Sequence, residues 1–322
     1  MMDADDQKLF ADALREVTAK CAGQSIDEAL GGLGWDEAFA EQPRMATSLL
    51  FEQQGLLNAT SQSLQTVFAY AAGLVLTPAM TVVLPAIGSI EPPGEVTPAG
   101  IVVHGLATVA ALRSDSAVAV VRVAADLVAA VTLSPDELTF SPVEGMDADL
   151  CLVRVRTLQP VPVSRATTLP ATWPVAVAAA QRALAHELVG VSRAMLRLAR
   201  DHAVDRIQFG QPIASFQAVR HRLSDSLVAV EAADATAAAA WEAPSVTSSS
   251  LAKAVAGQGA LTVARHAQQV LAGMGFTREH PLHRHVRRAL VLDALFGSSR
   301  TLLDDLGAEA IRTGQLPDMV PL

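Results

Sequence analysis

Hydrophobic positions near the start of the chain recur with the period of a helix. Phe10, Leu14 and Val17 lie at positions i, i+4 and i+7, and a similar spacing returns between residues 64 and 71. Apolar residues at this spacing line one face of an amphipathic helix. Helices are therefore predicted from about residue 5 to residue 74. A loop is expected at the glycine cluster of residues 31–34, which no strand precedes and which lacks a complete dinucleotide-binding fingerprint.

The pattern changes near residue 77, where short apolar runs rich in valine, isoleucine, threonine, proline and glycine begin. From residue 150 to residue 158 the side chains alternate, so that Arg154 and Arg156 share one face and Val153 and Val155 share the other. Such alternation is typical of a half-buried antiparallel strand. A small β-domain is therefore predicted, with strands at residues 80–87, 100–106, 117–123, 127–133 and 150–158.

Long helical patterns return at residue 172, where Thr172 can cap a helix. Leu184, Leu188 and Val191 begin an apolar stripe that continues to residue 198 and should face a core. Further helices are predicted at residues 216–241, 251–271 and 281–295 and after residue 298, with caps from Ser215, residues 248–250, and Ser298 or Ser299. Long helices with short connections indicate a bundle.

These patterns together predict a mixed, mainly α fold. The expected domains are a shortened N-terminal helical part at residues 1–76, a small central β-domain at residues 77–171 and a C-terminal helical bundle at residues 172–322.

Charge and composition exclude several classes of function. The net charge of −9 argues against nucleic acid as a partner, because nucleic-acid binders cluster Lys and Arg into a basic surface. The densest basic patch, Arg284, Arg287 and Arg288, is expected to be a solvated helix face or a subunit contact. Cys21 and Cys151 lack metal-ligand spacing and are expected to be reduced, so no metal site is predicted.

The start of the chain and its longest apolar tract indicate where the protein works. The acidic residues 3–6 are the opposite of the basic start of a secretory leader. Arg122 and Asp126 interrupt the apolar tract of residues 117–133, which argues against a membrane span. A cytoplasmic protein without a membrane partner is expected.

One stretch between two predicted helices carries candidate chemistry. Arg206 is followed by Gly210, which permits a left-handed backbone, and by Pro212, which cannot continue a helix. An arginine held at such a junction can offer its planar donors to a phosphate or a carboxylate. On these grounds alone, a surface turn with an incidental arginine is an equally good interpretation.

The residue pattern of this stretch is more specific than its expected backbone geometry. The run Arg-x-Gln-Phe-Gly-x-Pro-Ile-x-x-Phe-Gln-x-Val that starts at Arg206 resembles the signature opening the C-terminal helical domain of flavin-dependent acyl-CoA dehydrogenases. Residues 269–281 resemble a later glycine-bearing segment of the same family. The resemblance is strong over residues 172–303 and weak in motifs before that, and the N-terminal helical part is about half as long as the family's.

The resemblance implies an acyl-CoA dehydrogenase-like fold and FAD as the cofactor, bound between two subunits. Arg206 would bind the pyrophosphate of FAD, and Gln208 and Phe209 would line the same pocket. Gln269 and Gly273 would contact the adenosine side. The alternative interpretations are an exposed helix-end residue for Gln269 and a core residue for Phe209.

Other parts of the family's machinery are missing. Residues 77–172 contain neither the Thr-Glu-Pro-x-Ala-Gly-Ser-Asp-type loop nor the tryptophan segment that faces the flavin ring. The two places where family members carry the glutamate base fall on Phe296 and Ala180, neither of which can accept a proton. Nearby Asp293 and Glu187 are expected to be solvated helix carboxylates. No catalytic residue is therefore assigned to this chain.

These losses suggest the shortened subunit of a heteromeric acyl-CoA dehydrogenase, of the type that actinobacteria use in steroid catabolism. The implied partners are a full-length dehydrogenase subunit, in an α2β2 assembly, an acyl-CoA substrate and an electron-transfer acceptor protein. Two alternatives stay open: a self-sufficient flavoenzyme with Asp293 or Glu187 as a displaced base, and a non-catalytic scaffold of the same fold.

Overall fold

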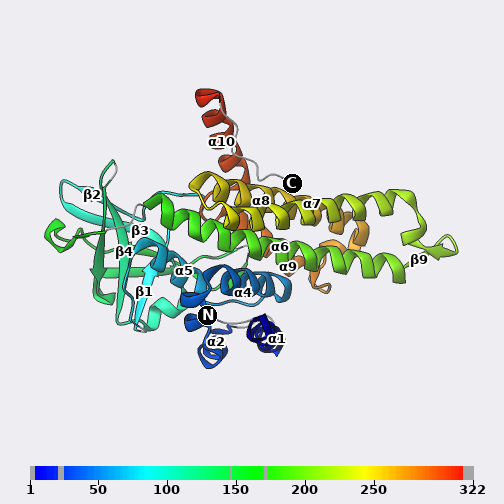
Figure 1. Ribbon diagram of the computed structural model, residues 1–322, viewed down its shortest axis with the longest axis horizontal. Coiled ribbons are helices and arrows are strands. Elements are labelled where there is room, and N and C mark those ends of the chain that lie inside the picture. Colours follow the sequence, from blue (N-terminus) through cyan, green and yellow to red (C-terminus); the bar gives the residue numbers. More distant parts are fainter. Residues whose placement is uncertain are drawn as a thin grey trace. The chain divides into compact units, whose positions relative to one another are not determined.

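The computed structural model describes residues 4–20, 25–77, 79–125, 127–145, 147–169 and 173–314 (Figure 1). The backbone contacts divide the chain into two units. The first comprises Met1–Ser61, Arg182–Asp293 and Ser299–Leu322, and the second comprises Gln62–Gln181 and Ala294–Ser298. The mixed, mainly α fold expected from the sequence is confirmed, with a central sheet and long C-terminal helices.

Four helices open the described part of the first unit: α1 (Ala4–Lys20), α2 (Asp27–Leu33), α3 (Trp35–Glu41) and α4 (Pro43–Leu57). The glycine cluster does not form the predicted loop, because Gly31 and Gly32 continue α2 and only Gly34 interrupts the helix. Gly34 has a φ of 73°, a left-handed conformation that ends α2 and starts α3. The indole of Trp35 donates a hydrogen bond of 3.2 Å to the carbonyl of Ala46, which fixes α3 against α4.

The long helices are α6 (Trp173–Asp205), α7 (Gln217–Glu242), α8 (Val246–Leu271), α9 (Leu282–Ala294) and α10 (Ser299–Thr313), as the periodicity predicted. The starts of α7 and α8 differ from the predicted ones. Phe216, not Ser215, precedes α7, without a side-chain cap. Ser245 caps α8 in a capping box with Ser248, so this helix starts five residues earlier than expected. The predicted cap Thr172 lies outside the described residues.

Helices α4 and α6 cross at reciprocal glycines. A Cβ atom at Gly55 would lie 2.0 Å from the carbonyl oxygen of Glu187, and one at Gly190 would lie 2.1 Å from that of Glu52. Both distances are far below van der Waals contact, so only glycine permits this separation of the two backbones. Arg193 of α6 also pairs with Glu52 of α4 and, at 2.8 Å, with Asp234 of α7.

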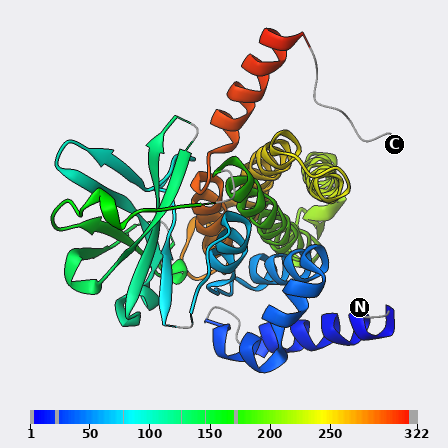
Figure 2. The same ribbon diagram turned by 60° about the vertical axis from the view of Figure 1, so that its left-hand side comes forward.

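The second unit contains α5 (Ser63–Ala72) and a sheet whose strands follow the order β6-β7-β3-β2-β4-β5-β8, with β1 paired to β4 (Figure 2). The strands are β1 (Met80–Val83), β2 (Gly94–Thr97), β3 (Gly100–Thr108), β4 (Ser116–Ala124), β5 (Leu127–Leu133), β6 (Leu138–Pro142), β7 (Leu152–Thr157) and β8 (Thr167–Thr168). Alternation predicted β7 correctly: Val153 and Val155 join the buried core, and Arg154 and Arg156 face solvent.

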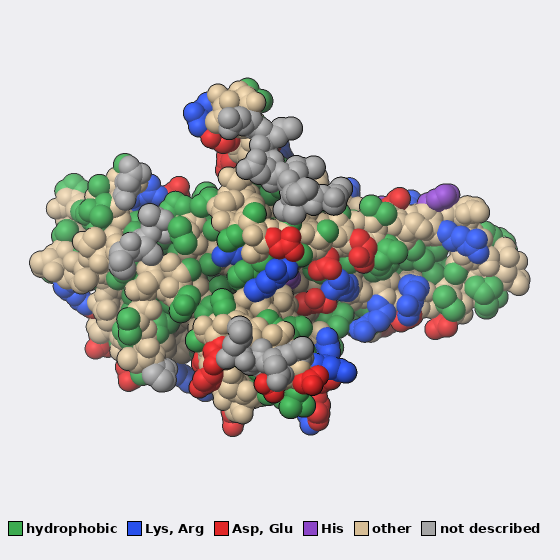
Figure 3. Space-filling model, viewed as in Figure 1, with side chains coloured by type: hydrophobic (Ala, Val, Ile, Leu, Met, Phe, Trp, Pro, Cys, Tyr) green, Lys and Arg blue, Asp and Glu red, His purple; other side chains and the backbone are tan. Residues whose placement is uncertain are grey.

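Pairing in the sheet is antiparallel except where β1 and β2 run parallel to β4. The predicted first strand stops at Val83 rather than continuing to residue 87, and β2, β6 and β8 were not predicted from the sequence. On the face of the molecule shown in Figure 3, basic and acidic side chains are interspersed. Among the described residues, no helix is long and apolar enough to cross a membrane.

Candidate functional site

The arginine stretch folds into a tight hairpin beyond the end of α6 (Figure 1). Strands β9 (Ile207–Gln208) and β10 (Gln211–Pro212) pair antiparallel, which leaves Phe209 and Gly210 as a two-residue turn. Their φ values are 52° and 78°. Positive φ at both central positions is typical of the type I′ turn that closes short hairpins.

Arg206 is held by backbone hydrogen bonds and exposes its side chain. Its N–H donates to the carbonyl of His202 at 2.9 Å, and its own carbonyl accepts the N–H of Ile213 at 2.8 Å. These bonds hold the hairpin base against the end of α6. Within the described part of the chain, no carboxylate lies at ion-pair distance from Arg206, so its guanidinium is available to an anionic ligand.

Phe209 lies at the tip of this hairpin. Its side chain is 92% exposed and meets Phe216 edge-on, with ring centroids 6.1 Å apart. The interpretation of Phe209 as a core residue is therefore wrong for the chain alone. A positive φ is energetically unfavourable for a residue with a Cβ atom, and at Phe209 this unfavourable backbone conformation holds an aromatic side chain in solvent. Gln208 is also exposed, and its side-chain amide donates to the carbonyl of Ile207 at 2.7 Å.

The second motif lies where α8 ends. Gln269 is exposed in the last turn of α8, and Ala272, with φ 51° and ψ −129°, redirects the chain into a short 3-10 helix, η6 (Ala272–Phe276). Gly273 is exposed, and a Cβ atom there would meet nothing within 4 Å. Packing within the chain does not require this glycine. Phe276, in the same turn, is 72% exposed.

The two motifs come near each other where His202, before the hairpin, and His280, beyond η6, interact electrostatically. Burial lowers the pKa of His280, just beyond η6, and the charge of His202, one helical turn before Arg206, lowers it further. No hydrogen bond or ion pair joins the hairpin to Gln269 or Gly273 in the residues that the structure describes. The predicted site residues therefore form two groups. Arg206, Gln208 and Phe209 lie at the hairpin, and Gln269 and Gly273 lie at the end of α8.

The position where the family resemblance would put the catalytic base is occupied by a buried aromatic side chain. Phe296 is 2% exposed, has a φ of 54°, and packs its ring 5.6 Å from that of Phe68. Phe68 in turn contacts Trp173 at 5.4 Å, and the carbonyl of Phe296 accepts a hydrogen bond of 3.0 Å from Gln181. The other possible place, Ala180, is fully buried. Neither position offers a group that can accept a proton.

Asp293 is not a solvated carboxylate, as was expected. It is 9% exposed, and its Oδ1 accepts the N–H of Ser299 at 3.0 Å, which caps the start of α10. The carbonyl of Asp293 accepts a hydrogen bond of 2.9 Å from Nζ of Lys253, which is fully buried. Burial lowers the pKa of Lys253 to about 8. Asp293 therefore fixes the connection between α9 and α10.

Glu187 is also buried rather than solvated, because it pairs with Arg288. Nη1 of Arg288 donates to Oε1 of Glu187 at 3.1 Å and to the carbonyl of Ala59 at 2.8 Å. Arg288 has no exposed surface, so the expectation of a solvated basic patch is wrong for this residue, whereas Arg284 and Arg287 are half-buried. The pair ties α6 and α9 to the segment after α4.

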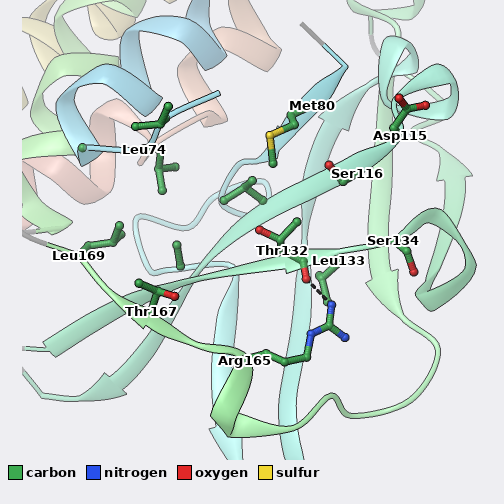
Figure 4. A pocket seen from close by; sticks show the side chains of 14 residues that line it. Leu74, Met80, Asp115, Ser116, Thr132, Leu133, Ser134, Arg165, Thr167 and Leu169 are labelled. Carbon is green, nitrogen blue, oxygen red and sulfur yellow. Dashed lines mark hydrogen bonds between the residues drawn. The ribbon is translucent and has the colours of Figure 1, made fainter. Parts of the chain in front are cut away.

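A pocket of about 540 Å³ opens beside the sheet of the second unit (Figure 4). Its polar lining includes Asp115 and Thr132, and Arg165, which binds Glu137 and the carbonyl of Thr132. Arg165 and Ser134 lower the pKa of Glu137 to about 2. None of the predicted site residues lies here. This pocket was not predictable from the sequence, because its lining comes from many separate segments.

The described residues contain no group of three His, Cys, Asp or Glu side chains that could hold a metal ion. Their exposed donors suit a different ligand. An unpaired guanidinium, an exposed aromatic ring and a glycine open to close approach fit the phosphates and the base of a dinucleotide.

Comparison with known proteins identifies the domain that carries these motifs. The family model for the acyl-CoA dehydrogenase C-terminal domain matches residues 176–311. Acyl-CoA dehydrogenase IpdE2 of Mycobacterium tuberculosis is 32% identical over 189 residues, which cover 58% of this chain and 57% of the relative. Acyl-CoA dehydrogenase FadE34 of the same organism is 38% identical over 177 residues, covering 51% of this chain and 24% of the relative. The matches thus span less than two thirds of each relative.

Solved structures extend the similarity to the whole chain. A glutaryl-CoA dehydrogenase of Mycobacterium smegmatis in complex with FADH2 superposes with a TM-score of 0.74 and 14% identity, covering 99% of this chain and 97% of that one. A variant of the Tcur3481-Tcur3483 steroid ACAD superposes with a TM-score of 0.68 and 23% identity, covering 97% of this chain and 91% of that one. The ChsE4-ChsE5 complex of Mycobacterium tuberculosis superposes with a TM-score of 0.68 and 20% identity, covering 98% of this chain and 90% of that one. Residues 176–311 are therefore an acyl-CoA dehydrogenase C-terminal domain, within a chain that has the acyl-CoA dehydrogenase fold.

Proposed function

We propose that this chain is the shortened subunit of a heteromeric acyl-CoA dehydrogenase, which forms an α,β double bond in an acyl-CoA. The chain contributes to FAD binding, and a full-length partner subunit supplies the catalytic base. One observation carries the proposal: the chain keeps an exposed, unpaired Arg206 on its hairpin, while the place of the base contains the buried Phe296.

FAD is the cofactor that the family and its structural neighbours indicate. When bound, it supplies the hydride acceptor of the dehydrogenation. In this proposal Arg206 holds the pyrophosphate, Gln208 and Phe209 line the same pocket, and Gln269 and Gly273 contact the adenosine side. The exposure of all five residues supports a ligand shared with a second chain.

The seat for the flavin ring is assigned to the partner. Glu91, in the only Glu-Pro pair of the β-region, forms an ion pair with Arg122 and lies exposed. No tryptophan occurs between residues 77 and 171. The sheet of this chain thus lacks both motifs that face the ring in the family.

A displaced base within this chain is disfavoured. The carboxylate of Asp293 is engaged by the backbone of Ser299, and that of Glu187 by the guanidinium of Arg288. A general base must reach the proton that it removes, and both groups are already held inside the helical unit. This argues against the self-sufficient flavoenzyme.

The substrate class and the assembly follow by analogy. Two of the structural neighbours are complexes of two differently named chains, and one of them is a steroid ACAD. We extend this to an α2β2 assembly acting on a steroid-derived acyl-CoA in the cytoplasm, with an electron-transfer protein as acceptor.

Co-expression with full-length dehydrogenases tests the proposal. The purified chain alone should contain no stoichiometric flavin, whereas a complex with the correct partner should contain about one FAD per pair and oxidise acyl-CoA. A yellow homo-oligomer with about one flavin per chain, able to reduce an artificial acceptor with acyl-CoA, would overturn the division of roles.

Arg206→Ala tests the cofactor contact within that complex. Loss of one charge-assisted hydrogen bond, worth about 1.5–3 kcal/mol, should weaken FAD binding by about one to two orders of magnitude while the subunits stay associated. Arg265→Ala, an exposed arginine on α8, serves as the control. Unchanged flavin content and affinity in Arg206→Ala would instead support the non-catalytic scaffold.

A further inference from the structure

The solvent face of the sheet in the second unit carries a cluster of cationic and polar side chains that the cofactor site does not use. Arg154 and Arg156 alternate along β7, and the strand register places Ser141 of β6 beside Arg154, and Thr139 of β6 and His104 of β3 on either side of Arg156. All five side chains are exposed. The cluster therefore spans three neighbouring strands, β6, β7 and β3.

The two arginines have no acidic partner. Nη2 of Arg156 lies 3.4 Å from Nε2 of His104, and in the described ranges neither Arg154 nor Arg156 has a carboxylate at ion-pair distance. Elsewhere in the same unit, Arg122 is paired with Glu91 and Arg165 with Glu137. Two other arginines of this unit are thus neutralised by its own glutamates, whereas the charges of Arg154 and Arg156 are not.

Retaining the cluster costs energy in the isolated chain. The side chains of Arg154 and Arg156 leave the same face of β7 two residues apart, so their charges repel each other. Partial desolvation of this largely exposed ring and the two neighbouring arginines lower the pKa of His104, which favours the neutral ring that can accept from Arg156. A local cationic cluster is also unexpected on a chain with a net charge of −9. An incoming carboxylate would relieve the repulsion.

The shape of the face selects the class of ligand. Small molecules bind in concave pockets, whereas these side chains stand on an exposed sheet face at its outer edge, where β6 is the terminal strand. The strand residues that line the pocket beside the sheet lie on β1, β4, β5 and β8, away from β6, β7 and β3 in the strand order. An extended protein surface fits such a face better than a single phosphate does.

We infer that the β6–β7–β3 face binds a carboxylate-rich surface of a partner protein, through Arg154 and Arg156. Charge complementarity of this kind accelerates encounter and sets the orientation of docking. The inference does not rest on flavin binding, because the cluster lies in the sheet unit and shares no residue with the hairpin or with the end of α8.

The test uses the full chain and a hexaglutamate peptide as a probe, with hexaglutamine as the neutral control. NMR signals of the His104 ring report locally, because a carboxylate beside Arg156 must perturb them. Hexaglutamate should shift these signals in a saturable way at low salt, and the shift should fade as ionic strength rises. Hexaglutamine should leave them unchanged.

Variants separate the face from general charge. Arg154→Gln with Arg156→Gln should weaken hexaglutamate binding about tenfold, because each exposed charge contact is individually weak and both are removed together. The control, Arg113→Gln with Arg265→Gln, removes the same charge from exposed positions elsewhere and should change binding less than twofold. Arg154→Lys with Arg156→Lys keeps the charge and should retain most binding, which also guards against a folding defect.

Three outcomes would overturn the inference. Equal losses in the control pair would show that only net charge matters. An unresponsive His104 would show that the peptide binds elsewhere. Inorganic phosphate that displaces the peptide at constant ionic strength, with the same dependence on Arg154 and Arg156, would indicate a small-anion site instead of a protein-binding face.

Discussion

At the scale of single residues, the Arg288–Glu187 pair is the strongest candidate for a stability determinant. Its side chains are 0% and 6% exposed, so removal of one partner leaves the other charge buried. Arg288→Met should therefore lower the free energy of unfolding by about 3–5 kcal/mol. Urea denaturation followed by circular dichroism at neutral pH measures this loss.

Replacing both partners separates the ion pair from packing. Arg288→Met combined with Glu187→Leu removes both buried charges and should be much less destabilising than the sum of the two single changes, because apolar replacement of a whole buried pair is often neutral. Additive losses, or a loss below about 1 kcal/mol for Arg288→Met alone, would contradict the assigned role.

Two buried histidines should make stability depend on pH. Burial lowers the pKa of His186, whose Nε2 accepts the indole N–H of Trp241 at 3.1 Å, from 6.5 to about 4, with Asp234 opposing the shift and Arg44 and Arg193 adding to it. His285 is shifted to about 4 by burial and neighbouring arginines. Between pH 6.5, the ordinary pKa of histidine, and pH 4, the unfolded chain binds protons that the folded chain does not. The free energy of unfolding therefore has its full value above pH 6.5 and falls as the pH drops toward 4.

Each such histidine should contribute a slope of about 1.4 kcal/mol per pH unit below pH 6.5. His186→Gln removes one of the two groups and keeps an acceptor for Trp241, so the slope between pH 6 and pH 5 should fall by about that amount. Denaturant unfolding at several pH values measures it, with the exposed His221→Gln as control. An unchanged slope in His186→Gln would mean that His186 takes up its proton in the folded state as readily as in the unfolded state.

The residue scale also shows where sequence reasoning stopped. The positions of Arg206, Gln208 and Gln269 on exposed ends of helices and hairpin were consistent with the motifs. Asp293 and Glu187 were misjudged as solvated because they pack against residues far away in sequence. Lys253, which donates to the backbone carbonyl of Asp293, is 40 residues from it, and Arg288 is 101 residues from Glu187. Helical periodicity locates a face but does not identify a distant polar partner on it.

At the scale of elements, the crossing of α4 and α6 depends on Gly55 and Gly190. Gly55→Ala places a methyl group 2.0 Å from the backbone of Glu187, so the helices must move apart. Overpacking of cores costs about 1–3 kcal/mol, and more where a backbone is the obstacle. We expect Gly55→Ala to lower the free energy of unfolding by at least about 3 kcal/mol.

The matched control is Gly307→Ala on α10, where an added Cβ meets nothing within 4 Å. Alanine is favoured over glycine in a helix by about 0.8–1 kcal/mol, so this change should stabilise the chain or leave it unchanged. Thermal melts of both variants give the comparison. A Gly55→Ala protein as stable as Gly307→Ala would show that the two backbones can separate without cost.

Element types were predictable from periodicity, whereas their ends were not. The stripe that starts at Leu184 and the alternation through Arg154 and Arg156 each identified the correct element. The predicted start of α8 was wrong because neighbouring serines compete: Ser245 bonds reciprocally with Ser248, so α8 begins five residues earlier in the chain than expected. Short strands such as β8 are defined by pairing, here to Ala129 and Ala130, and carry no pattern of their own.

At the scale of the whole molecule, the fold class and the family signature were accessible from the sequence, because the motifs at Arg206 and Gln269 are contiguous. Features built from distant segments were not accessible. The pocket beside the sheet and the contact of Phe296 with Phe68 join residues that only the folded chain brings together. The division into three domains, the assignment of the cofactor-binding residues and the cytoplasmic location remain predictions.

In the assembled enzyme, we expect the catalytic base to lie on the partner subunit. Asp293→Asn keeps an oxygen that accepts the N–H of Ser299, so the connection between α9 and α10 should persist and turnover of the assembled enzyme should change only a few-fold. Glu187→Gln is a poorer probe, because it would leave Arg288 buried without its counter-charge. Removing the true base should reduce the turnover number about a hundredfold to ten-thousandfold.

That larger loss should appear on changing a glutamate of the partner subunit, with flavin content and assembly unaffected. Single-turnover flavin reduction by acyl-CoA separates the chemical step from binding and from reoxidation. If Asp293→Asn alone abolished flavin reduction in an intact complex with full flavin content, the base would belong to this chain. The roles assigned to the two subunits would then be reversed, and the burial of Asp293 would have to be relieved when the partner binds.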